Sequence, residues 1–218
     1  MTAAIVFDLD NTLFDPTTIP LDLIAPAEQA AREANVGAEA VPVKHLEAAL
    51  VQSRREAFSL VAKAYGLPTG IANAWRAVSS CLEVKGPLQL YDDVLPALEC
   101  LREKKLLLTS GFRRMQQSKI AALGIERFFE SVYIDEVRNG VTRGKLQVLR
   151  EILDEWGLKA CEVLIVGDSA ESEIAAGNQL GMPTVQILRD GVRRTPDAKY
   201  HIKSLMELPK IIEERGGA

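Results

Sequence analysis

The sequence is poor in the residues that build disulfide scaffolds, histidine-based sites and polyanion-binding surfaces. Its 218 residues include three cysteines and two histidines, and its formal net charge is -4. Cys81, Cys100 and Cys161 show neither paired nor metal-site spacing, so we expect buried thiols in a reducing compartment. The acidic balance, without a long run of lysine or arginine, argues against nucleic acid as the main partner.

Long apolar runs and a basic leader are also missing. The apolar run near the start of the chain stops at Asp8, and no later stretch approaches the length of a membrane span. We therefore expect a cytoplasmic protein without a membrane partner. Hydrophobic residues make up 47% of the chain, which is enough for one full-sized core and a smaller inserted part.

Two aspartates follow the first apolar run of the chain. Residues 5–7 have the composition of a buried parallel strand, and Asp8 stands where such a strand would end, two residues before Asp10. Ligands of open α/β sheets bind beyond the carboxyl ends of the strands, so both carboxylates would face the ligand crevice. Carboxylates this close repel each other unless a cation lies between them, and oxygen ligands suit Mg²⁺. The alternative is an ordinary turn at a strand end, where aspartate and asparagine are common.

Residues 16–88 differ from the rest of the chain because they contain only helical patterns. Helical spacing covers 21–35, 43–65 and about 71–82, and glycine and proline residues separate these segments. The insertion follows the first strand directly, so it would cover Asp8 and Asp10. We interpret it as a lid, and the alternative is a helical subdomain that only fills out the core.

Residues 1–15 and 89–218 form the second predicted part, in which strands and helices alternate. This order predicts right-handed crossovers and an α/β fold with a doubly wound parallel sheet. The expected strands, after the first, are 106–111, 131–135, 163–168, 183–188 and 200–202. The expected helices are 94–104, 113–123, 145–156, 170–180 and 205–214.

Further polar residues stand at the ends of the predicted strands and at helix starts. Thr109 and Ser110 end the second strand, Lys145 opens a helix, and Asp168 ends the fourth strand, with Glu173 one turn into the next helix. Phosphoryl transfer needs a nucleophile, a metal that neutralises phosphate oxygens, and cationic or N–H donors around the phosphorus. These residue types supply each part, although each alone is common in a turn or a helix cap.

The order of these motifs resembles the haloacid dehalogenase superfamily of phosphohydrolases. Asp8-Leu-Asp10-Asn-Thr12 is similar to the first motif of that family, and Leu107-Leu-Thr109-Ser-Gly to the second. Lys145 matches the third motif, and Val166-Gly-Asp168-Ser with Glu173 matches the fourth. The resemblance covers essentially the whole chain. Residues 16–88 are similar to the helical cap of the phosphoglycolate-phosphatase-like branch.

The resemblance implies a role for each matched residue. Asp8 would be the nucleophile that forms an aspartyl-phosphate, and Asp10 the general acid and then the base. Thr109, Ser110 and Lys145 would bind the phosphate. Mg²⁺ would be held by the Asp8 carboxylate, the Asp10 backbone carbonyl and Asp168, with Thr12 and Glu173 beside the metal site. Two departures are Leu146, where relatives often have proline, and Glu173, where aspartate is commoner.

Several other functions share features with this Mg²⁺-dependent phosphatase. A phosphosugar mutase of the same superfamily shares the first motif and stays open. A dehalogenase needs no acid at position 10, and a non-enzymatic receiver module orders its acids differently and lacks the inserted helices. Residues 140–146 fall one residue short of a P-loop. The expected substrate is a small phosphorylated metabolite, whose identity the sequence leaves open together with the oligomeric state.

Overall fold

A parallel sheet forms the centre of the protein. The computed structural model describes residues 1–138 and 140–217. Within these residues the sheet has six strands in the order β3-β2-β1-β4-β5-β6, and every neighbouring pair is parallel. This confirms the predicted α/β class and the doubly wound sheet. The strands are β1 (Ala4–Phe7), β2 (Lys104–Gly111), β3 (Ser131–Glu136), β4 (Val163–Gly167), β5 (Thr184–Ile187) and β6 (Tyr200–Ile202).

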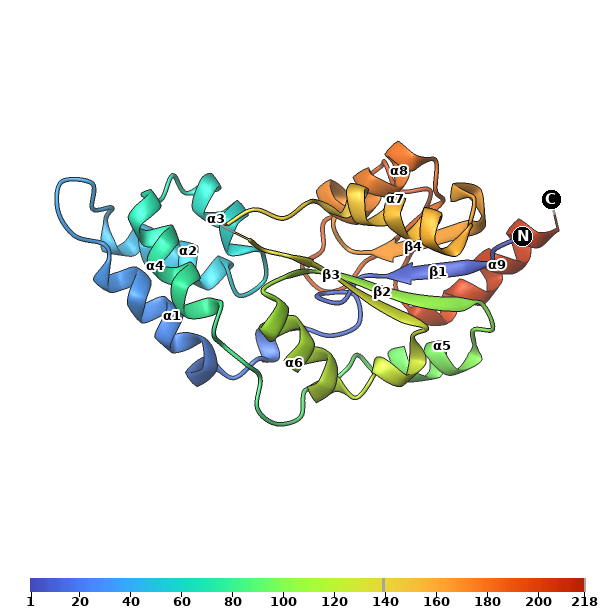
Figure 1. Ribbon diagram of the computed structural model, residues 1–218, viewed down its shortest axis with the longest axis horizontal. Helices are drawn as coiled ribbons and strands as arrows, with labels where there is room; N and C mark the ends of the chain where they lie inside the picture. The colour runs from blue at the N-terminus through green and yellow to red at the C-terminus, as the bar shows by residue number, and fades with distance from the viewer. Residues whose placement is uncertain (139, 218) are drawn as a thin grey trace.

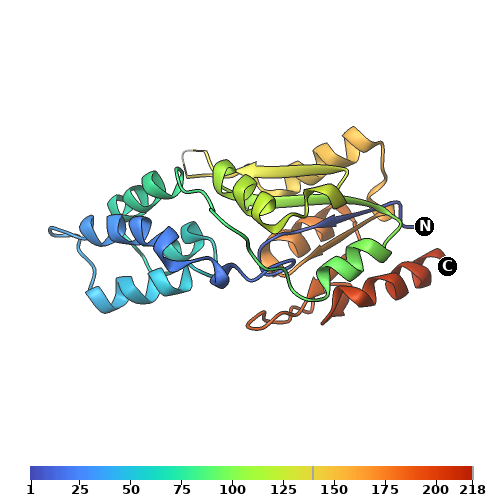
Figure 2. The same cartoon turned by 90° about the horizontal axis from the view of Figure 1, so that it is seen from below.

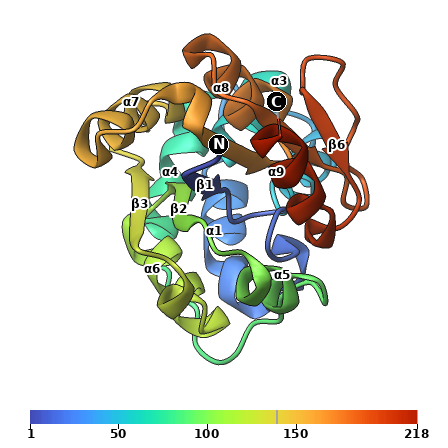
Figure 3. The ribbon, with the colours of Figure 1, turned by 90° about the vertical axis from the view of Figure 1, so that its right-hand side faces the viewer.

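Helices cover both faces of the sheet (Figure 1 and, seen along the strands, Figure 3). One face carries α5 (Val94–Cys100), α6 (Arg113–Leu123) and α9 (Leu208–Gly216), and the other carries α7 (Lys145–Trp156) and α8 (Ala175–Leu180). Strand β1 supplies both cores, with Ile5 and Phe7 on the first face and Ala4 and Val6 on the second. A central parallel strand is apolar on both sides for this reason.

Four helices form a separate layer beyond the carboxyl ends of the strands (Figure 2). They are α1 (Leu21–Glu33), α2 (Val43–Gln52), α3 (Phe58–Ala64) and α4 (Thr69–Ser79). This layer has its own small core, made by Ala31, Leu46, Leu50, Phe58, Ala62 and Ile71. The amphipathic helices therefore bury their apolar faces mainly against one another, while Leu23 and Ile24 of α1 also pack against the core of the sheet.

Among the predicted helices, the segments 43–65 and 94–104 show instructive differences from the structure. The segment 43–65 forms two helices, α2 and α3, separated by a turn at residues 53–57. These five residues include neither glycine nor proline, so the helical pattern of the sequence gives no sign of the turn. Contacts outside the helix hold that turn, since the Arg55 carbonyl accepts a hydrogen bond from Asn11. The helix from Val94 ends at Cys100 and not at residue 104, because Lys104 already pairs with Ala4 in the sheet.

The cysteines do not lie where we expected them. Cys81, Cys100 and Cys161 are all exposed free thiols, so the prediction of buried thiols was wrong. Cys100 illustrates the reason: Ala97 and Leu98 occupy the buried side of α5, and Leu101, directly after the helix, is buried as well. Among residues 1–138 and 140–217, no helix combines the length and apolar character that crossing a membrane requires.

Candidate active site

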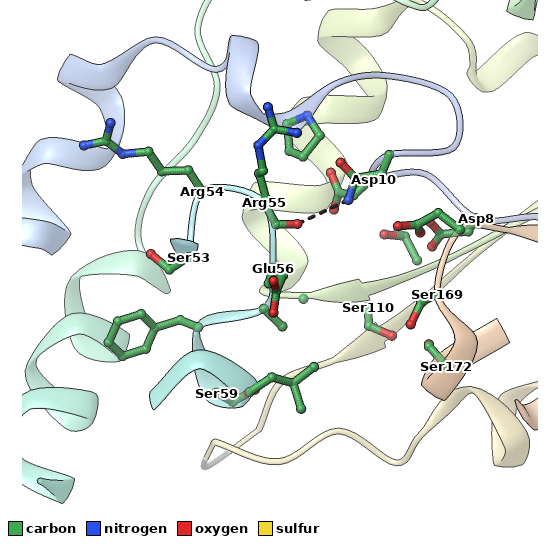
Figure 4. A pocket seen from close by; sticks show the side chains of 18 of the residues that line it. Asp8, Asp10, Ser53, Arg54, Arg55, Glu56, Ser59, Ser110, Ser169 and Ser172 are labelled. Atoms are coloured by element: carbon green, nitrogen blue, oxygen red, sulfur yellow. Dashed lines mark hydrogen bonds between the residues drawn. The ribbon is translucent and has the colours of Figure 1, made fainter. Parts of the chain in front are cut away.

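Neighbouring strands bring the predicted site residues to one edge of the sheet. Asp8 directly follows β1, Asp168 directly follows β4, and Thr109 lies near the end of β2. Lys145 is the first residue of α7. Because β1 lies between β2 and β4, Asp8 stands between the other two strand ends. Figure 4 shows Asp8 and Ser110 on this edge, facing the segment of residues 53–59.

The Lys145 ammonium connects two buried carboxylates. Lys145 Nζ donates to Asp8 Oδ1 and to Glu173 Oε1, and all three side chains are at most 7% exposed. The other oxygen of Asp8 accepts from the Thr12 hydroxyl at 3.3 Å, and the other oxygen of Glu173 accepts from the Ser169 N–H at 3.1 Å. Buried charges need such partners, so this network fixes the side chains where the strands end.

The acids of this network have raised pKa values. Burial raises the pKa of Asp8 to about 7, and Glu173 adds to the rise while Lys145 opposes it. Burial also raises the pKa of Asp168 to about 8, with further contributions from Asp8 and Glu173. Burial alone would lower the pKa of Lys145, but the charges of Asp8 and Glu173 hold it above its usual value. One lysine therefore does not balance the negative charge of this site.

The same acids could hold a metal ion. Carboxylate oxygens of Asp8, Asp168 and Glu173 lie within 4.8 Å of one another. The donor set is oxygen only, as Mg²⁺ prefers, and a divalent cation would counter both the burial of these charges and their mutual repulsion, which together raise the pKa values. The Asp10 carboxylate is not part of this cluster, so its predicted contribution to the metal depends on its backbone carbonyl. Glu173, which we expected beside the metal site, belongs to the cluster itself.

Helix α6 holds the Asp10 carboxylate apart from this cluster. Lys119 Nζ donates to both carboxylate oxygens, at 2.9 and 3.1 Å, and Gln116 Nε2 donates to one of them at 3.2 Å. Gln116 Nε2 also donates to the Thr109 hydroxyl at 2.6 Å and to the Ser110 carbonyl at 2.8 Å. Both Gln116 and Lys119 are buried, so they position Asp10 firmly relative to the end of β2.

Asp135 of β3 positions the loop that leads into Lys145. Its side chain is fully buried and accepts hydrogen bonds from the N–H groups of Arg143 at 2.9 Å and Gly144 at 3.0 Å. The Ser110 hydroxyl also donates to it, at 3.4 Å. The hydroxyl of Ser110 thus contacts Asp135, while the residue as a whole still lines the cavity described below.

Sequence reasoning missed the residues that position the site, namely Gln116, Lys119, Asp135 and Gln186. Gln186 is fully buried in β5 and donates to the Asp168 carbonyl at 2.9 Å. A usable signal existed in α6, where Gln116 and Lys119 share the buried face with Ile120 and Leu123. Polar residues inside an apolar stripe need buried partners, and the predicted site supplies them.

A cavity of about 950 Å³ lies between the strand ends and the helical layer. Asp8, Thr109, Lys145 and Asp168 line its floor. Its opposite wall comes from α1, α4 and residues 53–60, including Arg54, Phe58 and Trp75. The two parts touch where Asn11 Nδ2 donates to the Arg55 carbonyl at 3.2 Å, drawn as a dashed line in Figure 4. The helical layer therefore lies across the cavity from the acids.

Comparison with known proteins supports one family. The model of haloacid dehalogenase-like hydrolases matches residues 2–181. Glyceraldehyde 3-phosphate phosphatase of Methanopyrus kandleri is 30% identical over 200 residues, which are 87% of this chain and 85% of that protein. N-acylneuraminate-9-phosphatase of Mus musculus is 29% identical over 57% of this chain, and the chain covers about half of that protein (52%).

Solved structures show the same fold. A HAD phosphatase from Thermococcus onnurineus has a TM-score of 0.65 and 25% identity, with 97% of this chain and 98% of that chain covered. The HAD hydrolase YfnB from Bacillus subtilis, which was crystallised bound to magnesium, has a TM-score of 0.62 and 20% identity over 97% of this chain and 98% of that chain. Both comparisons extend over the sheet and the helical layer together.

Proposed function

This chain belongs to the haloacid dehalogenase-like hydrolases, and we propose that it is a Mg²⁺-dependent phosphatase that forms an aspartyl-phosphate on Asp8. The phosphatases among its relatives confirm the predicted enzyme class, a phosphomonoesterase of this superfamily that acts on small phosphorylated metabolites. We further propose that Mg²⁺ is the metal and that the matched residues have the roles described below.

One observation carries the proposal. The Asp8 carboxylate is buried at the floor of the cavity, contacts the Lys145 ammonium, and belongs to a cluster of acids that fits a divalent cation. A carboxylate in this setting can attack phosphorus while positive charge neutralises the phosphate oxygens.

The other residues of the site would bind the phosphate, hold the metal and orient Asp8. Lys145 and the Thr109 hydroxyl would bind phosphate oxygens at the floor of the cavity, each already held in place by buried partners. Asp8, Asp168 and the Asp10 carbonyl would hold Mg²⁺, with Glu173 next to them, and the metal would supply charge neutralisation of the phosphate. Thr12 would orient Asp8 through its hydroxyl.

Asp10 would protonate the leaving alkoxide and then remove a proton from the attacking water. Its side chain is 29% exposed and lines the cavity, so it can reach both the leaving group and a water molecule. Lys119 and Gln116 would keep this carboxylate at a fixed place near Thr109. General acid and base catalysis depends on such positioning.

We also propose that residues 16–88 are the cap of a core made by residues 1–15 and 89–218. The separate small core of the helical layer and its position over the strand ends support this division. The cap would exclude water and contact the leaving group. Action in the cytoplasm stays a prediction.

Two substitutions test the mechanism. Asp8→Asn removes the nucleophile, so phosphate release should drop to background with every substrate. Asp10→Asn keeps the nucleophile and should still react with an ester of an acidic phenol, which needs little protonation, while the second step stalls. Mass spectrometry should then detect a phosphoryl group on Asp8.

The same experiment can contradict the assignment. If Asp10→Asn is as inactive as Asp8→Asn with every leaving group and traps no phosphoryl group, the two roles are wrongly assigned. Phosphate release also separates a phosphatase from a mutase, because a mutase returns an isomeric ester and not free phosphate.

A further inference from the structure

The cavity is too large for the phosphoryl group and a very small leaving group alone. Its volume of about 950 Å³ lies near the upper end of the roughly 300–1,000 Å³ typical of pockets for drug-sized ligands. The floor is occupied by the acids and Lys145, so the remaining space faces the helical layer. The chemistry of that wall should therefore match the part of the substrate that leaves.

Arg54 is a rigidly held cation on this wall. Its guanidinium donates to Glu28 through Nε at 3.0 Å and lies 2.9 Å from the same carboxylate through Nη2. The Glu28 side chain is 7% exposed, and its other oxygen accepts from Arg32 at 3.2 Å. Glu28 thus shares its charge between two arginines, and Arg54 keeps N–H groups free for another acceptor.

Two further arginines line the same cavity. Arg55 and Arg76 form no ion pair among the residues that the structure describes, and Glu56 is the carboxylate that accompanies them on this side. The helical side of the cavity therefore carries three arginines, Arg54, Arg55 and Arg76, and two carboxylates, Glu28 and Glu56. Arg32, which lies outside the cavity lining, also pairs with Glu28, so positive charge is in excess on this side. Its charge is opposite to that of the acidic floor, where the carboxylates would hold the metal.

Ser79, the last residue of α4, gives an independent indication of a ligand. It lines the cavity, it is 3% exposed, and its hydroxyl has no hydrogen-bond partner in the described part of the chain. A buried hydroxyl without a partner is costly and uncommon in folded proteins. A bound acceptor oxygen would satisfy it.

We propose that the leaving group of the substrate carries a second anionic group, a carboxylate or a phosphate, which Arg54 and Ser79 bind at the cap wall. Arg55, whose Nη1 donates to the Asp190 carbonyl at 3.5 Å, and Arg76, whose guanidinium lies against Gly140, would add positive charge elsewhere along the cavity. This inference rests on the proposed phosphatase function and specifies its substrate class. An anion there would receive charge-assisted hydrogen bonds from a guanidinium whose position is fixed before binding.

Matched esters test the inference. 6-Phosphogluconate and sorbitol 6-phosphate differ only at carbon 1, which is a carboxylate in the first and a neutral alcohol in the second. Sorbitol 1,6-bisphosphate places a phosphate at the same position. We expect kcat/KM for at least one of the two anionic esters to exceed that for sorbitol 6-phosphate by about tenfold or more, and the better ester identifies the group.

Two variants test whether Arg54 and Ser79 cause the preference for an anionic ester. Arg54→Gln and Ser79→Ala should each reduce the ratio of kcat/KM between the preferred anionic ester and sorbitol 6-phosphate. The matched control is Arg150→Gln, which removes the same charge from an exposed position of α7 and should keep the ratio. Ser79→Ala should leave the Tm unchanged or raise it, because it removes a buried hydroxyl that has no partner.

The outcomes separate this inference from the function on which it depends. Equal kcat/KM for all three esters, in an enzyme that hydrolyses p-nitrophenyl phosphate, would overturn the second anionic group and leave the phosphatase intact. A preference that survives both Arg54→Gln and Ser79→Ala would overturn the assigned wall. Absence of phosphate release from p-nitrophenyl phosphate and from all three esters would overturn the phosphatase itself.

Discussion

The buried acids at the floor of the cavity should make the stability of this protein depend on pH and on Mg²⁺ together. Burial raises the pKa of Asp8 from 3.8 to about 7 and that of Asp168 to about 8. Between about pH 4 and pH 8, Asp8 and Asp168 are therefore partly protonated in the folded protein, whereas in the unfolded chain they have lost their protons. The free energy of unfolding of the metal-free protein must therefore fall as pH rises through this window and level off above about pH 8.

The size of this effect follows from the shift. One pKa unit corresponds to about 1.4 kcal/mol, so the rise of roughly three units at Asp8 sets an upper limit of about 4 kcal/mol for that group. Mg²⁺ binds the deprotonated acids and should offset the loss, by about 2.7 kcal/mol at roughly 100 times its dissociation constant. The stabilisation by Mg²⁺ should thus be larger at pH 8 than at about pH 5.5.

Urea unfolding with and without Mg²⁺, at several pH values from about 5.5 to 8, measures both quantities. This range excludes acids with lowered pKa values, such as Glu47 and Asp93, which affect stability only at lower pH. Asp168→Asn should flatten the metal-free slope and abolish the Mg²⁺ effect, while Asp154→Asn, an exposed acid of α7, should change neither. A metal-free protein that gains stability with pH, or a Mg²⁺ increment equal at both ends of the range, would refute this reasoning.

Other consequences follow from the same geometry. A chelator should abolish hydrolysis of p-nitrophenyl phosphate and Mg²⁺ should restore it, whereas Ca²⁺ should inhibit because it prefers more ligands and a looser geometry; full activity in excess chelator contradicts the metal assignment. Asp135→Asn should raise KM for phosphate esters and destabilise the protein by about 1–3 kcal/mol in urea unfolding, because its amide donors would face the N–H groups of Arg143 and Gly144; unchanged stability and KM contradict the positioning role. Gly167→Ala should reduce the Mg²⁺-dependent rise in Tm, because a methyl group there would lie 2.5 Å from Glu173 Cγ; an unchanged rise contradicts the place of Glu173 in the acid cluster.

The strand ends were predictable because their signal is local. A buried parallel strand is apolar throughout, so an acid directly after it marks both the end of the strand and the edge where ligands bind. Asp8 after β1 and Asp168 after β4 follow this rule, and the sheet places the two strands side by side. The alternation of strands and helices then fixed the remaining topology.

The positioning residues could not be predicted in the same way, because their partners are distant in the chain. Lys119 lies 109 residues from Asp10, and nothing near either residue in sequence identifies the other. The break at residues 53–57 is similar, since Arg55 contacts Asn11 across 44 residues. Helical propensity continues through that segment, and tertiary contacts override it.

Backbone contacts of the loop before Lys145 position this lysine. The family motif that Lys145 resembles often has proline after the lysine, where a fixed φ would prepare the start of the helix. This chain has Leu146 there, and another device fixes the loop: the buried Asp135 carboxylate binds the N–H groups of Arg143 and Gly144, and Gly144 adopts a φ of 86°. A side chain other than glycine rarely adopts that φ, so Gly144 allows the turn and Asp135 holds it. The Lys145 ammonium is thereby directed to Asp8 and Glu173 by a carboxylate on the neighbouring strand β3 and not by the residue that follows it.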